Sequence, residues 1–289
     1  MVIYVLSKFI VTSDQHLGYK NSDSKSFSNF LDYILDRNDV DTLILLGDLV
    51  DMWRRDVSGL FLIFSNVVSK LLDIKSSGKK VYLVVGNHDY HLLQLKAEDY
   101  PFGFLSNWTP LPSAESTAPN DTAGTKVRYV FKHGWEFDLA QHPPIMEAMC
   151  FNFSDTIGDQ KTNIYAFLEN IKDKFGDVLK GIINFHGGDE KYVQHLLQPP
   201  EERLQPYMTD VEKKAWSSVN EGETLIFGHT HRPFVSTDHK IVNTGSWVTD
   251  AQIHNTFVEL NGDRPRILNF KDRETVRDIT ESLTFPIPA

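Results

Sequence analysis

The chain has a single cysteine, Cys150, among its 289 residues. One cysteine cannot form an internal disulfide, so a disulfide-stapled secreted fold is excluded and a cytoplasmic protein is expected. The sequence also lacks an apolar run long enough to cross a membrane, and its N-terminus lacks the features of a signal peptide. Positive charge is scarce: 29 Lys and Arg against 39 Asp and Glu give a net charge of -10. A broad basic surface for nucleic acid is therefore not favoured, although a metal site could still receive a phosphate group.

The first ninety residues predict a parallel sheet. Apolar or β-prone runs at 9–13, 42–46 and 81–85 have the pattern of buried strands. Amphipathic helices are predicted between them, over about residues 24–37 and 60–74. This alternation of strand and helix is the signature of an α/β fold.

The rest of the chain is predicted to extend a single domain that spans residues 1–289. Residues 99–124 have the composition of a surface loop, and residues 138–220 that of a helical insertion or cap. Further strands are expected at 127–131, at 224–227, around Ile241, around Phe257 and at 266–268, the last after an Asn261-Gly262 hairpin turn.

Five predicted strands end in polar side chains that bind metals or transfer protons. In parallel sheets such side chains gather at the edge formed by the carboxyl ends of the strands. Asp14 and His16 have one residue between them, as do His229 and His231, so both members of each pair can reach one ion. The clusters are Asp14 and His16, then Asp48 and Asp51, then Asn87, His88 and Asp89, then His133, and finally His229 and His231.

Imidazole and carboxylate together suit Mn, Fe, Zn or Co better than Ca or an all-oxygen Mg site. These clusters offer more candidate ligands than the four that one tetrahedral zinc ion needs. The economical interpretation is a pair of divalent ions, most favourably Mn, about 3.5–4 Å apart and activating a water that bridges them.

The five motifs, in this order, resemble the calcineurin-like metallophosphoesterase superfamily. The motifs are Asp14-x-His16, Gly47-Asp48-x-x-Asp51, Gly86-Asn87-His88-Asp89, His133 and Gly228-His229-x-His231. The resemblance implies a four-layer α/β/β/α sandwich, with two facing sheets and a helical insertion. It also implies hydrolysis of a phosphate ester or pyrophosphate bond by a hydroxide that bridges the two metals.

The resemblance assigns roles to individual residues. One metal would be held by Asp14, His16, Asp48 and His231, and the other by Asp48, Asn87, His133 and His229, with Asp48 bridging. His88 would be the acid for the leaving group or would stabilise charge, and Asp51 would orient it. Asn87 would also face the phosphate.

Outside the ligand set, three arginines and one carboxylate need an interpretation. Arg54, Arg55 and Arg232 follow metal motifs and could bind phosphate oxygens, with surface ion pairing as the alternative. Asp89 is interpreted as a partner of loop backbone.

Two resemblances within the superfamily compete over the substrate. The Gly47-to-Trp53 segment, the predicted insertion and the His229-Thr230-His231-Arg232-Pro233 segment are similar to UDP-2,3-diacylglucosamine hydrolases, which cleave a pyrophosphate. Those enzymes typically have Arg where this chain has His88. The Asp14-to-Tyr19 segment together with Gly86-to-Asp89 is similar to repair exonucleases. The favoured substrate is a phosphorylated small molecule or nucleotide conjugate, of the phosphodiesterase or nucleotide-diphosphate pyrophosphatase type. A DNA nuclease and a non-catalytic scaffold for a protein complex are the alternatives.

Overall fold

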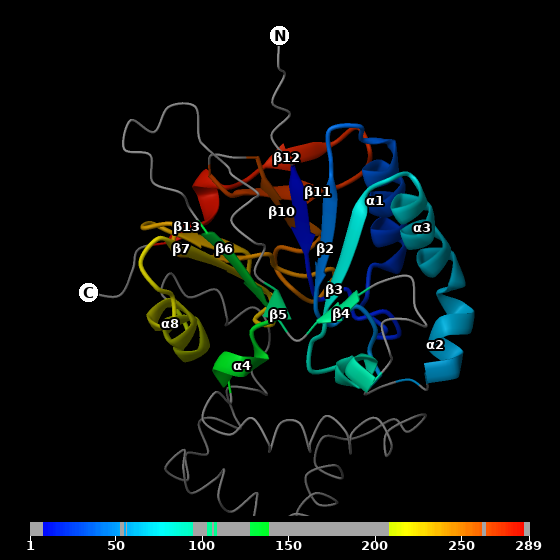
Figure 1. Cartoon of the computed structure of the whole chain (residues 1–289), viewed down its shortest axis with the longest axis horizontal. Coiled ribbons are helices and arrows are strands. Elements are labelled where there is room, and N and C mark those ends of the chain that lie inside the picture. The colour runs from blue at the N-terminus through cyan, green and yellow to red at the C-terminus, as the bar shows by residue number, and fades with distance from the viewer. Residues whose placement is uncertain are drawn as a thin grey trace, which may run out of the picture.

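The computed structural model describes most of the predicted α/β core. The described residues are 8–52, 55, 57–94, 103–105, 107–108, 128–138, 208–261 and 264–285. No helix within these ranges is long and apolar enough to cross a membrane. Figure 1 shows two sheets with helices on their outer faces.

Seven strands form the first sheet, in the order β12-β11-β10-β1-β2-β3-β4 (Figure 1). The predicted parallel arrangement is confirmed, because β1 to β4 are parallel neighbours. The hairpin predicted after residue 260 is also confirmed, because β10 pairs antiparallel with β11. The strands are β1 (Phe9–Thr12), β2 (Thr42–Leu46), β3 (Lys80–Val84), β4 (Gly103–Leu105), β10 (Thr256–Leu260), β11 (Arg266–Phe270) and β12 (Val276–Asp278).

Six strands form the second sheet, in the order β13-β8-β9-β7-β6-β5. At its centre, β6 and β7 are parallel, and so are β7 and β9. The strands are β5 (Asn107–Trp108), β6 (Arg128–Lys132), β7 (Glu223–Phe227), β8 (Phe234–Ser236), β9 (Ile241–Asn243) and β13 (Thr284–Phe285).

Side chains that alternate along the strands build three apolar layers between four layers of secondary structure. In β1, Ile10 packs toward the helices while Val11 packs between the sheets. In β7, Ile226 joins the layer between the sheets, whereas Leu225 and Phe227 pack on the opposite face with α8. This alternation follows from the two-residue period of a strand. It produces the α/β/β/α order expected for the fold.

The helices that cover the first sheet are α1 (Ser24–Asp36), α2 (Val57–Ile63) and α3 (Ser65–Ser76). The apolar face predicted for α1 is buried, with Phe27, Phe30 and Ile34 inside the core. One helix was predicted over residues 60–74, but the structure has two, because Phe64 leaves helical geometry and packs partly against the core.

The second sheet is covered on its outer face by α8 (Asp210–Ser217), which packs with α4 (Trp135–Asp138). The remaining turns are η1 (Tyr90–Gln94) and η4 (Glu281–Leu283). The predicted insertion over residues 138–220 lies outside the described residues except at its two ends. In the predicted loop over 99–124 only β4 and β5 are described, and the tail after Lys271, which had no clear pattern, contains β12 and β13.

Candidate metal centre

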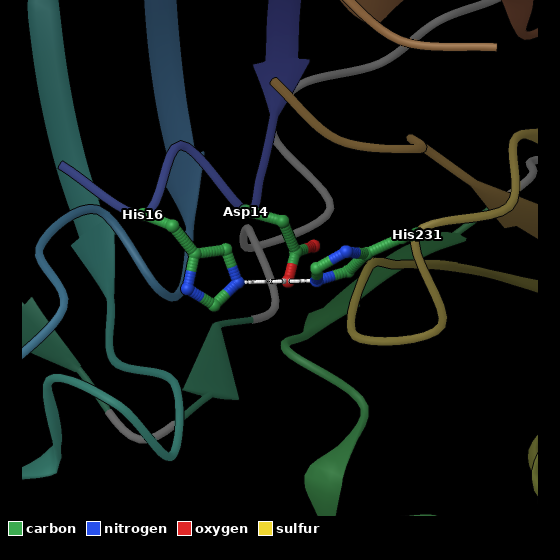
Figure 2. A group of neighbouring side chains, drawn as sticks. All are labelled: Asp14, His16 and His231. Atoms are coloured by element: carbon green, nitrogen blue, oxygen red, sulfur yellow. Dashed lines mark hydrogen bonds and ion pairs between the residues drawn. The ribbon is translucent and has the colours of Figure 1, made fainter. Parts of the chain in front are cut away.

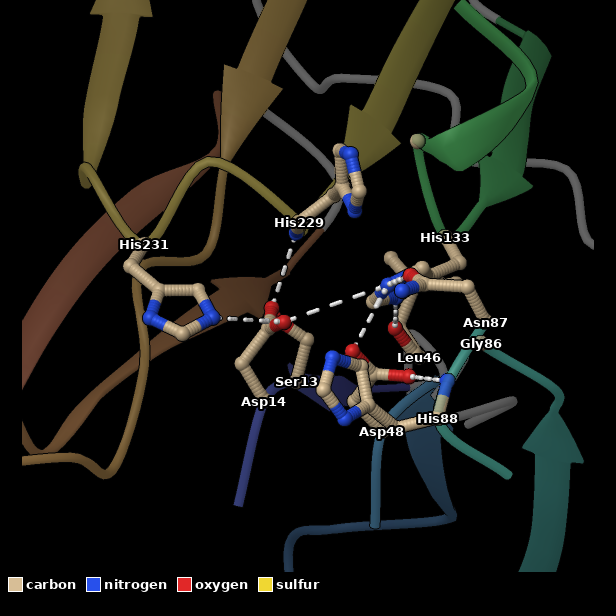
Figure 3. Close-up of polar contacts among 12 residues, drawn as sticks. Ser13, Asp14, Leu46, Asp48, Gly86, Asn87, His88, His133, His229 and His231 are labelled. Atoms are coloured by element: carbon tan, nitrogen blue, oxygen red, sulfur yellow. Dashed lines mark hydrogen bonds and ion pairs between the residues drawn. The ribbon is translucent and has the colours of Figure 1, made fainter. Parts of the chain in front are cut away.

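The polar strand ends of the two sheets meet in one cluster. Asp14, Asp48 and Asn87 follow β1, β2 and β3, which are parallel and therefore end at one edge of the first sheet. His133 and His229 follow β6 and β7, which end together in the second sheet. Figure 3 shows residues from both sheets converging on Asp14.

Asp14 lies at the centre of the cluster with no exposed surface. Its Oδ2 accepts hydrogen bonds from Ser13 Oγ at 2.5 Å and from the backbone N–H of His229 at 2.9 Å. Its Oδ1 is buried and accepts no hydrogen bond. Instead, the Nε2 atoms of His231, His16 and His133 lie 3.2, 3.7 and 3.9 Å from Oδ1. Figure 2 shows Asp14 between His16 and His231.

Asp48 lies between two imidazoles. Its Oδ2 is 3.5 Å from His16 Nε2 and 3.3 Å from His133 Nε2. His133 Nε2 is also 3.2 Å from Asn87 Oδ1. The other oxygen of Asp48 accepts the backbone N–H of His88 at 2.8 Å. Among the described residues, Asp14, His16 and His231 can together hold an ion, and so can Asp14, Asp48 and His133.

The second ring nitrogens of two histidines are occupied by fixed partners. His133 Nδ1 lies 2.9 Å from the carbonyl oxygen of Leu46, and His16 Nδ1 lies 3.3 Å from Asp51 Oδ2. Both partners accept hydrogen bonds, so Nδ1 is the protonated nitrogen in each neutral ring. Each Nε2 then directs its lone pair at the cluster, which is how proteins orient metal-binding imidazoles.

His229 is placed differently from the other six predicted ligands. Its backbone N–H bonds to Asp14, but its ring is turned away from that carboxylate (Figure 3). Its Nε2 lies 2.6 Å from Oδ2 of Asp138, at the end of α4. The ring centre is still only 5.3 Å from that of His133. Sequence reasoning missed Asp138, which has no motif spacing to His229.

The backbone of the cluster is strained. Seven non-glycine residues in the described part of the chain have a positive φ, and five of them are predicted ligands: Asp14, His16, Asp48, His229 and His231. Each such conformation costs on the order of 1–3 kcal/mol and persists only where surrounding contacts enforce it. Here the loops after β1 and β2 are bonded to each other, with Asp14 N–H to Gly47 O at 3.0 Å and His16 N–H to Asp48 O at 2.8 Å.

Charge within the cluster is balanced between carboxylates and imidazoles. Burial alone would raise the pKa of Asp14, but His133 and His231 hold it well below its usual range. Burial alone would lower the pKa of His133, but Asp48 and Asp14 raise it to about 10. For His16, burial is likewise outweighed by the neighbouring carboxylates of Asp14, Asp51 and Asp48, which raise the pKa to about 10. The buried carboxylates therefore require compensating positive charge, as protons or as metal cations.

Asp51 connects His88 to the cluster. It is fully buried, and its Oδ1 lies 3.1 Å from His88 Nδ1 while its Oδ2 faces His16. His88 is half-buried, and its ring packs edge-on against that of His16 at 4.6 Å. The carboxylate of Asp51 favours the imidazolium form of His88. Burial lowers the pKa of His88 more than Asp51 and Asp48 raise it.

Asp89 accepts hydrogen bonds from the loop backbone, as the sequence analysis predicted. One carboxylate oxygen accepts the N–H of Leu49 and the other the N–H of Gly86, each at 2.7 Å. Burial and the charge of Asp48 raise the pKa of Asp89 to about 7.

The predicted phosphate-binding arginines occupy different surroundings. Arg54 lies outside the described residues. Arg55 is exposed, and its Nε donates to the carbonyl of Gly18 at 3.3 Å. Arg232 is 5 % exposed and lines the cavity beside the cluster, but its guanidinium is paired with buried Glu212 and lies over Phe234.

Glu212 is a second residue that sequence reasoning missed. Its side chain accepts hydrogen bonds from Thr230 Oγ1 and Arg232 Nε, each at 3.1 Å, and it also caps α8 through the backbone of Thr209. The signal available in the sequence was the capping-box spacing of Thr209 and Glu212, which marks a helix start.

A cavity of about 350 Å³ opens beside the cluster. Seven predicted site residues are in its lining: His16, Asp48, Asn87, His88, His229, His231 and Arg232. The polar strand ends, the unbonded oxygen of Asp14 and this cavity form one site.

A sequence profile of calcineurin-like phosphoesterases matches residues 7–233, and this span includes every residue of the cluster. The chain belongs to the calcineurin-like phosphoesterase family. It is a phosphoester hydrolase by that membership, and its clustered Asp and His side chains indicate a dinuclear divalent metal site. The two ligand groups described above share buried Asp14, whose unbonded Oδ1 faces three imidazole nitrogens, so these residues fit metal cations.

Other comparisons give distant similarities. A dimetal phosphatase from Danio rerio is 12% identical, with 95% of this chain and 99% of that chain covered and a TM-score of 0.46. A cold-active protein tyrosine phosphatase is 13% identical, with 96% and 80% covered and a TM-score of 0.38. The nuclease MPE from Pseudomonas putida is 13% identical, with 93% and 86% covered and a TM-score of 0.37. No curated protein matches the sequence.

Proposed function

We propose that this phosphoesterase hydrolyses phosphodiester or nucleotide-diphosphate bonds with two divalent ions, preferentially Mn. The observation that carries the proposal is the pair of ligand groups around Asp14 and Asp48, because His16, His231 and Asp48 of these groups line one cavity. Three histidines in these groups favour Mn, Fe, Zn or Co over Ca.

Seven residues would hold the ions. Asp14, His16, Asp48 and His231 would bind one, and Asp48, Asn87, His133 and His229 the other. Asp48 Oδ2, at 3.5 and 3.3 Å from imidazoles assigned to different ions, suits the bridging role. When bound, the ions would supply positive charge for the phosphate oxygens and lower the pKa of an attacking water.

His88 would transfer a proton to the leaving oxygen. It lines the cavity, and Asp51 holds its Nδ1 at 3.1 Å, which fixes the orientation of the ring. A positioned acid of this kind contributes roughly 10²–10⁴-fold to the rate. Asn87 would place a neutral amide beside the phosphate. This amide would stabilise the negative charge that develops on the phosphate oxygens. Arg54 and Arg55 remain proposed contacts for the outer phosphate oxygens.

His229 would reach the second ion by rotation of its ring. Its backbone is already anchored to Asp14, while its ring faces Asp138. Rotation about the side-chain bonds would bring it toward His133, whose ring centre is 5.3 Å away.

The test is to measure bound metal by elemental analysis and to assay a substrate panel with Mn. The panel contains p-nitrophenyl phosphate, bis(p-nitrophenyl) phosphate, nucleotide-diphosphate conjugates, and single- and double-stranded DNA. We expect about two metal ions per chain and the highest kcat/KM on a diester or diphosphate. Faster hydrolysis of DNA would identify a nuclease. No bound metal and no turnover with any divalent ion would overturn the proposal and favour the scaffold.

A further inference from the structure

The cavity beside the metal cluster has a second group of lining residues that the proposed chemistry does not use. Tyr19 and the segment from Asp250 to Ile253 line it together with the metal-binding side chains. A phosphate held at the cluster would occupy only part of a space of about 350 Å³. The group esterified to that phosphate would therefore contact these residues.

The segment that carries Asp250 is tied to the metal-binding loop. The N–H of Trp247 donates to the carbonyl of Asp14 at 3.0 Å, and the N–H of Thr249 donates to Asn21 O at 2.8 Å. Val248 also forms an isolated bridge with Ser22. These backbone contacts set the position of Asp250 relative to Asp14, which is a requirement for a binding subsite.

The carboxylate of Asp250 is held by two neutral donors. Its Oδ2 accepts Tyr19 Oη–H at 2.8 Å and an Nδ2–H of Asn21 at 3.2 Å. Burial alone would raise the pKa of Asp250, but these two hydrogen bonds lower it below the ordinary value. The group is therefore ionised at neutral pH.

The charge of this region is unusual for a pocket that receives phosphate. Arg232 is the one Lys or Arg in the described lining, and Glu212 pairs with it. Tyr19, Asp250 and exposed Gln252 thus present one negative charge together with neutral polar groups. A second anionic group placed directly against Asp250 would be repelled by that carboxylate, whereas a hydroxyl there could donate a hydrogen bond to it.

We propose that Asp250, Tyr19 and Gln252 form a subsite for the alcohol portion of the substrate. The subsite takes an uncharged, hydroxyl-bearing group, such as a sugar or polyol, and rejects a group that carries a second phosphate. This inference rests on the proposed phosphodiesterase activity.

The test compares two p-nitrophenyl esters of thymidine 5′-phosphate, one with a free 3′-hydroxyl and one with a 3′-phosphate. Both release p-nitrophenol, so one assay gives both kcat/KM values. Each value is divided by that for bis(p-nitrophenyl) phosphate with the same protein. We expect the normalised kcat/KM of the wild type to be about tenfold higher for the 3′-hydroxyl ester. Only the 3′-phosphate ester would place a negative charge against the carboxylate of Asp250.

Three variants distinguish an effect of the Asp250 charge on this substrate preference from an effect of packing in the pocket. Asp250→Asn should reduce the preference to less than about threefold, because it removes the repulsion. Tyr19→Phe removes a hydrogen bond but keeps the carboxylate, so the preference should remain. Asp36→Asn is the control, since this exposed acid is the last residue of α1, pairs with Arg273 and does not line the pocket. Thermal unfolding checks that each variant is folded.

Several results would overturn the inference. One is a wild type that prefers the 3′-phosphate ester or shows no preference. Another is an equal loss of preference in Asp250→Asn and Tyr19→Phe, which would point to packing. Preferred hydrolysis of p-nitrophenyl phosphorylcholine would assign the carboxylate to a cation. If bis(p-nitrophenyl) phosphate is not hydrolysed with any metal, the proposed function itself fails, and the inference fails with it.

Discussion

Glycine precedes three of the cluster residues because a neighbouring side chain already occupies the space of a Cβ. A Cβ on Gly47 would overlap the ring of His133, and one on Gly86 would overlap the carboxylate of Asp48. A Cβ on Gly228 would overlap Ser13 and Asp14. The glycines of the three motifs therefore let loops from different strands approach closely.

Gly47→Ala tests this explanation against Gly78→Ala. Both glycines have a positive φ, of 86° and 94°, so the backbone conformation alone should cost each substitution about 1–2 kcal/mol of unfolding free energy. Gly47→Ala should cost more than this, because the added Cβ must also displace His133. Only Gly47 has His133 against it, whereas nothing lies within 4 Å of a Cβ on Gly78. Metal titration should show weakened binding in Gly47→Ala alone. Equal metal affinity in the two variants would contradict the explanation.

His88 and Asn87 are neighbours with separable roles. His88→Ala should retain both metals and lose about 10²-fold or more in kcat, because it removes a positioned acid. Asn87→Ala should instead weaken one metal, since its Oδ1 lies 3.2 Å from His133 Nε2. Elemental analysis and steady-state kinetics on both variants measure this difference. A His88→Ala enzyme with wild-type turnover on every ester would show that another group is the acid.

At the scale of elements, the loop that carries His229 and His231 is held from three sides. Asn243 of β9 donates to Gly228 O at 2.7 Å and to Thr230 Oγ1 at 3.1 Å. Glu212 of α8 accepts from Thr230 and Arg232, and Asp138 of α4 contacts His229. Both ends of the predicted insertion therefore contact one metal-binding loop. These contacts offset the cost of the positive φ values at His229 and His231.

Glu212→Gln should weaken metal binding by about 10–100-fold, the usual effect of losing an outer partner of a metal site. The matched control is Thr209→Ala, which removes the cap of the same helix at a cost of about 1 kcal/mol but leaves the contacts of Glu212 with the loop. Calorimetric titration with Mn and chemical unfolding of both variants distinguish the two effects. If Thr209→Ala weakens Mn binding as much as Glu212→Gln does, Glu212 acts through helix stability alone.

At the scale of the whole molecule, a buried carboxylate in β10 of the first sheet should make the stability of the protein depend on pH in the acidic range. Glu259 is 2% exposed, lies 2.8 Å from Arg37 and 3.7 Å from Lys8, and pairs with Arg266. Burial opposes ionisation of Glu259, but the hydrogen bond from Arg37 and the other cations lower its pKa below 4.5.

A lowered pKa in the folded state means that Glu259 stabilises the protein above its unfolded pKa. That contribution is lost as the pH falls below about 4.5, the ordinary pKa of a glutamate, and then through the lower pKa of the folded protein. The wild type should therefore lose on the order of 1 kcal/mol more stability over this fall in pH than Glu259→Gln. Denaturant unfolding at each pH measures the difference, with exposed Glu281→Gln as the control. Parallel curves for the wild type and Glu259→Gln would show that the ion pairs contribute no net stability.

The central strands of both sheets were predictable because they are local patterns in the sequence. Apolar runs predicted β1, β2, β3, β6 and β7, and polar residues directly after them marked the edge where the cluster lies. The break at Phe64 and the short strands after Lys271 were not predictable, since packing against the core and pairing with distant strands determine them.

The sequence by itself determined which side chains lie at the strand ends, because the residue that follows a buried strand must emerge at the edge of the sheet. Only the tertiary structure decided how these side chains are oriented. The positive φ of Asp14, the pairing of Arg232 with Glu212 and the contact of His229 with Asp138 depend on loops that are far apart in the chain. No spacing in the sequence encodes such contacts, since they form only when segments far apart in the chain pack against one another.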